Sequence, residues 1–455
     1  MLLSKILKSY ILIGILLYAI LFIYWRDSIS FFNTINVFVF ASYAFTLSFC
    51  LNKDESFYTN RNLIAITFLY SITFVILYMQ LSDYYIGNTF IFSESDARYY
   101  ERYSFIMKDL SFSDALEYIS RYWGYDDWGA PMFMALMLKI VPSKLFVNFC
   151  YVMMNTIGAV CLFSIGKSIM SKQYAFFGTL AYSLSSYTMF FVSSYLKEEI
   201  MVFFVIVSMY MLYRYWERRN LLYLVSGGWI SLLIIFFRPP VAIFVWVAYA
   251  TLLLMGNKSN TIRVFFIILA LSVIAIAANM IQYSADRYAN GGEIITSYMF
   301  TTTSMFQKLT LYAGALIGPF PQMIQYSTEL TYKSLYGAGL LFKFLLFFPF
   351  WKGLAYAVKS KSYEVYPLFI FALLEIIGLS IALDGLELRK ALPHVPLFIL
   401  AAFWFVDKYD EDADDTVQQT PYYVWTRREL YVCIGVVFIA TLVWNTIKSG
   451  GPINP

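Results

Sequence analysis

The sequence is dominated by apolar runs of about 16–22 residues, which recur along the whole chain. A helix of that length can cross a hydrocarbon core about 30 Å thick, and helices satisfy their own backbone hydrogen bonds inside lipid. Hydrophobic residues make up 60% of the chain and charged residues 14%. A soluble protein of 455 residues could not cover this composition with polar surface. We therefore predict an all-α polytopic membrane protein.

We expect about 13 transmembrane helices. Their predicted positions are about residues 10–25, 33–51, 63–82, 145–166, 174–193, 199–213, 221–237, 240–256, 264–282, 334–350, 364–383, 391–406 and 430–447. A further apolar stretch, 309–328, is broken by the sequence Gly-Pro-Phe-Pro that begins at Gly318. If this stretch crossed the membrane, the lysine cluster at 352–361 would move outside, against the preference of basic residues for cytoplasmic loops. We therefore expect 309–328 to be re-entrant or interfacial, and the sequence leaves a full crossing open.

This topology places the N-terminus in the cytoplasm and the C-terminus outside, and we expect the protein in a bacterial inner (plasma) membrane. The predicted parts are an N-terminal three-helix segment (1–82), an outer loop with interfacial helices (83–143), membrane helices four to nine (144–282), a second large outer loop with the re-entrant segment (283–333), membrane helices ten to twelve (334–406), an acidic cytoplasmic loop (407–429), and the last helix with its tail (430–455). The acidic loop opens with DKYDEDADD, which is typical of a solvated, disordered connector.

The first outer loop carries the pattern of interfacial helices. One apolar face is predicted by residues at helical spacing: Tyr99, Tyr103, Ile106 and Leu110. Ser111, followed three residues later by Asp114, predicts the start of a second helix. The stretch 129–143 is apolar nearly all round but too short to cross the bilayer. We expect these helices to lie in or just under the membrane interface.

Charged residues recur at the outer ends of the predicted helices, where a charge at membrane depth is costly and usually functional. They belong to four separate outer segments: Glu94 and Asp96; Lys197, Glu198 and Glu199; Arg238; and Arg389. Any one of them alone is typical of a snorkelling or solvated charge. Because four segments contribute charges to one membrane face, we predict that these side chains form a functional site.

The layout of these residues resembles a known superfamily. Asp96 follows a predicted transmembrane helix and precedes interfacial helices, Glu198 or Glu199 lies in a later outer hairpin, and Arg389 precedes two prolines. In this the chain resembles the GT-C superfamily of membrane glycosyltransferases, of the family 39 kind. The resemblance implies a GT-C-like fold with an active site on the extracytoplasmic face. It departs from the superfamily in two respects. The acid there usually follows the first helix, whereas Asp96 follows the third, and an adjacent Asp-Glu pair is absent here, because Ser95 separates Glu94 from Asp96.

The resemblance implies an inverting glycosyltransferase whose donor is a polyprenyl-phosphate-linked sugar and whose acceptor is a cell-envelope glycan or lipid. Such a reaction needs a carboxylate to take the acceptor's proton and fixed cations to stabilise the departing phosphate. The expected catalytic residues are Asp96, as base, and Glu198, as a positioning group or second acid, with Glu94 and Glu199 as alternative acids. The expected phosphate and donor ligands are Lys197, Arg238, Arg389 and His394.

Aromatic residues crowd the first outer loop, where they can anchor the chain in the membrane interface or stack on a sugar. The candidate sugar contacts are Tyr99, Tyr100 and Trp123. Asp126 and Asp127 could bind a divalent cation. No cofactor is certain from the sequence, and dependence on a metal stays open.

Two other functions stay open. An O-antigen or capsule-type polysaccharide polymerase shares the long outer loops and outer arginines. A lipid-linked oligosaccharide flippase or other transporter needs polar residues at the bilayer midplane, where Lys343 and Glu375 stand out, although we expect these two to pair structurally. The net charge of +4 is spread over many loops, which argues against a nucleic acid partner. The four cysteines lie in apolar runs without a CxxC pair, which argues against a zinc site or disulfide framework.

Overall fold

The computed structural model describes residues 2–24, 31–87, 95–256, 317–324, 332–381, 389–414 and 427–448. Within these ranges the regular secondary structure is helical, with no strand. Seven of these helices are long and apolar enough to cross a membrane, or eight if a bent pair forms one span. The prediction of an all-α, multi-pass membrane protein is confirmed, and the count of about 13 spans stays a prediction.

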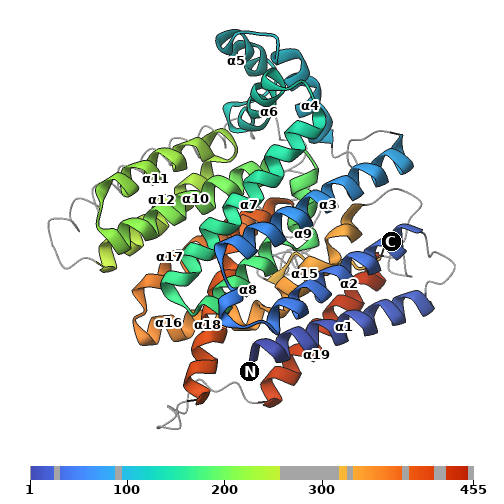
Figure 1. The fold of residues 1–455 in the computed structure, drawn as a ribbon, viewed down its shortest axis with the longest axis vertical. Coiled ribbons are helices and arrows are strands. Elements are labelled where there is room, and N and C mark those ends of the chain that lie inside the picture. The colour runs from blue at the N-terminus through green and yellow to red at the C-terminus, as the bar shows by residue number, and fades with distance from the viewer. Residues whose placement is uncertain are drawn as a thin grey trace.

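The helices fall into membrane bundles and a small layer at one end of the molecule (Figure 1). The bundle helices are α1 (Leu2–Tyr24), α2 (Phe31–Leu51), α3 (Asn60–Ile86), α7 (Lys144–Ile169), α8 (Lys172–Ser183), α9 (Ser186–Ser193), α10 (Lys197–Arg218), α11 (Leu221–Leu233), α12 (Pro239–Gly256), α15 (Gly337–Leu345), α16 (Phe347–Ser360), α17 (Tyr366–Ile381), α18 (Val395–Asp414) and α19 (Arg427–Lys448). The layer consists of α4 (Ser95–Met107), α5 (Phe112–Ser120) and α6 (Gly129–Ile140).

Short 3₁₀ turns join several of these helices at the places that matter for the site: η3 (Tyr125–Asp127), η4 (Ile234–Phe236) and η7 (Arg389–His394). Large apolar side chains on the outer helices stay exposed, among them Phe45 on α2 and Trp229 on α11. Exposed apolar side chains of this kind suit a surface that faces lipid. The buried core lies between the helices, around α7, α8, α10 and α18.

Every predicted span falls on helix except 264–282, which lies outside the described residues. Two spans differ from the prediction. The stretch 174–193 bends by 52° between α8 and α9, because Ser185 starts a new helix by accepting a hydrogen bond from Thr188 N. The predicted span 334–350 breaks at Leu346 and continues as α16 to Ser360. Pro349 lies in the first turn of α16 and lacks the N–H that would continue α15.

The described part of the predicted re-entrant stretch, 317–324, is mostly non-helical and largely buried. Lys343 Nζ donates to Gly318 O at 2.7 Å, and Asn445 Nδ2 donates to Pro321 O at 2.9 Å. Asn445 Oδ1 in turn accepts from Met323 N at 2.8 Å. Irregular backbone at membrane depth is tolerated where protein groups supply its hydrogen bonds in this way. Lys343 thus has a backbone partner here, in place of the expected Glu375.

At the end of the molecule away from the layer, carboxylates of α18 meet the starts of two other helices. Asp407 accepts from Ser171 N at 2.9 Å, and both oxygens of Asp410 accept from Leu2 N at 2.9 Å. The free N–H groups and the dipole of a helix start favour such carboxylates. The prediction of a solvated connector is therefore wrong for its first residues, because α18 continues to Asp414 and Asp407 is buried.

Candidate active site

The layer of α4, α5 and α6 matches the predicted interfacial helices (Figure 1). Ser111 caps α5 by accepting from Asp114 N at 3.2 Å, as its position predicted. The predicted apolar face of α4 is wrong by one position. Its buried residues are Ala97, Tyr100, Ser104 and Met107, whereas Tyr99 and Ile106 are exposed. Packing of α4 against α6 decides which face is buried, and the spacing of apolar residues in α4 does not reveal that partner.

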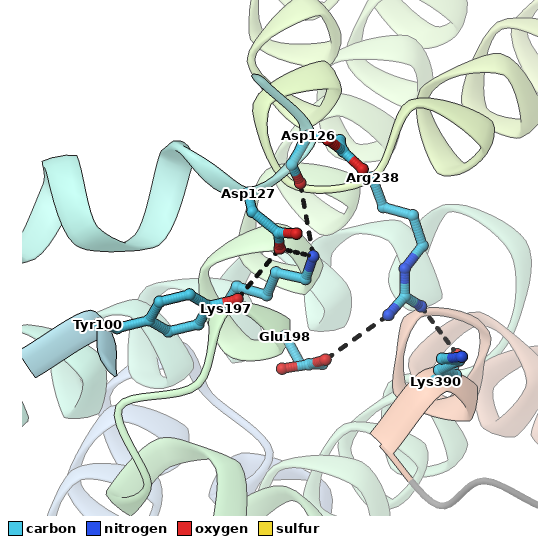
Figure 2. A network of polar contacts seen from close by, with 7 residues as sticks. All are labelled: Tyr100, Asp126, Asp127, Lys197, Glu198, Arg238 and Lys390. Carbon is cyan, nitrogen blue, oxygen red and sulfur yellow. Dashed lines mark hydrogen bonds and ion pairs between the residues drawn. The ribbon is translucent and has the colours of Figure 1, made fainter. Parts of the chain in front are cut away.

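One connection ties the layer to the membrane bundle (Figure 2). Asp127, in η3, forms an ion pair with Lys197, the first residue of α10. Tyr100 donates its hydroxyl to the same oxygen, Asp127 Oδ1, at 3.1 Å, and Lys197 Nζ also donates to Asp126 O at 3.4 Å. Burial raises the pKa of Tyr100, and the charges of Asp127, Glu198 and Asp96 add to the effect. The phenol therefore stays a hydrogen-bond donor at physiological pH.

A second contact, beside the first, joins α10 to two more segments, those of Arg238 and Lys390 (Figure 2). Arg238 Nη2 lies 3.6 Å from Glu198 Oε1, and Arg238 Nη1 donates to Lys390 O, in η7, at 3.3 Å. The Glu198 side chain is 2% exposed and that of Arg238 is 19% exposed. Glu198 Oε2 is buried and has no hydrogen-bond partner within the described ranges. A buried carboxylate oxygen without a partner is costly, so this atom is suited to meet a substrate group.

The local backbone fixes where these side chains point. Tyr195, just before α10, has a positive φ of 54°, a strained conformation for a tyrosine, and its hydroxyl donates to Lys144 O. Glu198 follows in the first turn of α10, where the helix dipole favours a carboxylate. Arg238 precedes Pro239, the first residue of α12, and a residue before proline is held out of the helical conformation. Both side chains therefore start from constrained turns.

The structure brings together residues from all four predicted outer segments. Asp96 lies half-buried in the first turn of α4, one turn before Tyr100 on the same helix. Glu94 lies outside the described residues. Arg389 begins η7, and its side chain is not among those described. Its neighbour Lys390 contributes the carbonyl that binds Arg238.

The remaining predicted residues make none of these polar contacts. Glu199 is buried in the first turn of α10, and its Oε2 has no hydrogen-bond partner among the described residues. His394 ends η7 and is buried against Phe398, with a ring-centroid distance of 6.2 Å. Neither ring nitrogen of His394 has a partner in the part of the chain that is described. Tyr99 is exposed and meets the edge of Trp123 at 6.3 Å between ring centroids.

An apolar groove of about 430 Å³ lies between the layer and the bundle. Its walls come from α5 (Phe112 and Leu116), from α6 (Met132 and Phe133), from α10 (Ile200 and Phe204), from Leu233 of α11 and from Phe236 and Phe237, with Trp128 and Gly129 at the start of α6. Ile200 is two residues beyond Glu198, and Phe237 directly precedes Arg238. Glu198 and Arg238 do not line the groove themselves, but the backbone of Arg238 directly follows Phe237 in its wall.

The described side chains contain no group of three or more His, Cys, Asp or Glu arranged to hold a metal ion. Asp127, one of the two candidate cation ligands, is instead occupied by the ammonium of Lys197. Sequence reasoning missed that role, because Asp127 and Lys197 lie 70 positions apart. It also missed the groove, whose walls come from distant parts of the chain. No feature of the sequence predicts the hydrogen bond from Arg238 to the carbonyl of Lys390.

No known family model matches the chain, and no curated protein matches it. Solved structures of the oligosaccharyltransferase of the archaeon Archaeoglobus fulgidus are similar to it. The apo form has 14% sequence identity and a TM-score of 0.45, and the match covers 87% of this chain and 57% of that one. The form tethered to an acceptor peptide has 14% sequence identity and a TM-score of 0.45, and the match covers 88% of this chain and 57% of that one.

The oligosaccharyltransferase AglB from the same organism, in complex with an inhibitory peptide and a dolichol-phosphate, has 12% identity and a TM-score of 0.44. That match covers 87% of this chain and 56% of the other. The chain thus spans little more than half the length of these neighbours. These neighbours are oligosaccharyltransferases. With TM-scores below 0.5, these likenesses fix neither a reaction nor a substrate for this chain.

Proposed function

We propose that the protein is a membrane glycosyltransferase that moves a sugar from a polyprenyl-phosphate carrier to a glycan or lipid acceptor on the extracytoplasmic face. The observation that carries this proposal is the Glu198–Arg238 contact. It places a buried carboxylate, with one oxygen unpartnered among the described residues, beside a partly exposed arginine. Contacts of this site connect the first outer loop with three short outer hairpins.

The chemistry follows from these groups. The acceptor's oxygen attacks the anomeric carbon of the donor sugar, and the bond from that carbon to the carrier phosphate breaks with its electron pair on the phosphate. A carboxylate takes the acceptor's proton, a role that we assign to Asp96. Arg238 stabilises the negative charge on the departing phosphate. Glu198 holds Arg238 in place and offers Oε2 to a donor or acceptor hydroxyl.

The apolar groove supports a lipid-linked donor. Its walls are apolar or aromatic side chains apart from Gly129, which suits an isoprenoid chain, and its size is within the range of about 300–1,000 Å³ typical of ligand sites. A carrier lying there would place its phosphate near Arg238, because Phe237 and Arg238 are adjacent in the chain. Membrane lipid would reach the groove from the side of the bundle.

The test uses the purified protein with a panel of polyprenyl-phosphate monosaccharides and detects free polyprenyl phosphate. Turnover of a monosaccharide carrier in the presence of an acceptor supports the proposal. Turnover only of pyrophosphate-linked oligosaccharides would instead identify a polysaccharide polymerase. Movement of an intact lipid-linked glycan across vesicles, without cleavage, would identify a transporter.

A further inference from the structure

A second cleft, of about 380 Å³, opens on the layer of α4, α5 and α6, apart from the apolar groove. It follows the turn between α5 and α6, and its lining includes Ser120, Arg121, Tyr122, Trp123, Tyr125 and Trp128. Aromatic rings and hydrogen-bonding groups therefore share one hollow.

The cleft and the groove differ in chemistry although Trp128 lines both. The groove has no charged side chain in its walls. The cleft has Arg121 at its rim, paired with Glu117, and both of these side chains are more than half exposed. Exposed ionised groups at the rim favour contact with water over burial in lipid. The ligand of the cleft should therefore be hydrophilic and still offer flat apolar faces to aromatic rings, as a sugar ring does.

Tyr122 shows how such a ring could be bound. One side of Tyr122 stacks on Tyr103, with centroids 5.1 Å apart and ring planes at 23°, yet Tyr122 remains 55% exposed. The stack on Tyr103 holds the Tyr122 ring in a fixed orientation, so that little side-chain freedom is lost on binding. Ser120 and Arg121 next to it supply hydroxyl and guanidinium groups for sugar hydroxyls.

The cleft connects to the candidate active site through two rings. Trp123 packs on Tyr100, with centroids 5.7 Å apart, and Tyr100 donates to Asp127 beside Lys197 and Glu198. A ligand that reaches from the cleft to the reacting groups must therefore extend past Trp123 and Tyr100. One sugar cannot occupy both places. We propose that the cleft binds a sugar of an oligosaccharide acceptor, remote from the sugar that is modified, an inference that rests on the proposed function.

Binding of an array of defined glycans, from one to six sugars long, to the full-length protein in lipid nanodiscs tests this proposal. We expect binding of at least one glycan of two or more sugars. Its affinity should fall about tenfold in Tyr122→Ala, equivalent to about 1.4 kcal/mol, and recover in Tyr122→Phe, which keeps the ring. Tyr84→Ala, which removes another highly exposed tyrosine at the end of α3, is the matched control and should bind as the unmodified protein does.

Binding of no glycan longer than one sugar overturns the proposal. If Tyr122→Ala and Tyr84→Ala bind the glycan with equal affinity, the proposal is overturned as well, because the Tyr122 ring would then contribute nothing to glycan binding. Release of polyprenyl phosphate from the donor panel is measured on the same preparations. Donor turnover without glycan binding refutes only the cleft, whereas glycan binding without any donor turnover refutes the proposed function.

Discussion

Replacing Lys197 distinguishes two roles for this residue. The sequence predicts Lys197 as a phosphate ligand, whereas the structure pairs it with Asp127 of the layer. Side chains of this pair are 15% and 22% exposed. Exposed ion pairs contribute about 0.2–1 kcal/mol, and removal of one partner from a fully buried pair costs about 3–5 kcal/mol. For this intermediate burial we expect Lys197→Met or Asp127→Asn to lower stability by about 2 kcal/mol.

The double variant should be less damaged than the sum of the single variants, because it leaves no unpaired charge behind. We expect a coupling free energy of about 1–2 kcal/mol, within the range found for residues in contact. The assay compares the apparent melting temperature of the four proteins in detergent, alongside release of polyprenyl phosphate. Strictly additive losses would refute the structural role. A different result would identify Lys197 as a phosphate ligand instead. In that case Lys197→Met would keep its melting temperature and raise the KM for the donor, and adding Asp127→Asn would not lower that KM again.

Three further predictions concern the base, the groove and the topology. Asp96→Asn should lower transfer by about 10²–10⁴-fold with little change in melting temperature, and loss of activity only in Glu94→Gln would identify the other carboxylate. Gly129→Ala would place a Cβ 2.5 Å from Phe237 Cζ, so we expect a raised KM for the lipid-linked donor. Gly228→Ala, whose added Cβ meets no atom within 4 Å, should not change that KM, and equal behaviour of the two variants argues against the groove. In intact cells an impermeant thiol reagent should label Ser120→Cys and not Ser360→Cys, and the reverse pattern would invert the proposed orientation.

Hydropathy was sufficient to predict where the apolar helices lie, because an apolar run depends on composition over many residues. The predicted spans that can be compared fall on helix, and helices also form in the stretch 95–140, where interfacial helices were predicted. Breaks inside spans were harder to see. The bend after α8 depends on a single capping serine, Ser185, and the break before α16 is next to Pro349.

The charges at the ends of apolar runs were also visible in the sequence, because charges are rare at such positions. The partners of these charges could not be predicted from the sequence. The two residues of each ion pair come from different hairpins, and only the packing of the helices brings them into contact. The pairs are Asp127 with Lys197 and Glu198 with Arg238. The buried face of α4 was missed for a similar reason. Tyr100 is buried because it meets Asp127 and Trp123, and neither contact follows from the periodicity of α4 itself.

The measurement that tests the central claim most directly compares donor cleavage in Arg238 variants. The purified unmodified protein, Arg238→Lys and Arg238→Gln are each given a polyprenyl-phosphate monosaccharide that the protein turns over, and free polyprenyl phosphate is measured under single-turnover conditions. Loss of one group that stabilises developing negative charge lowers a rate by about 10²–10³-fold. We therefore predict a loss of that size in Arg238→Gln and a partial recovery in Arg238→Lys, which keeps the charge without the planar fork. Cleavage at the unmodified rate by Arg238→Gln in well-folded protein would contradict the account.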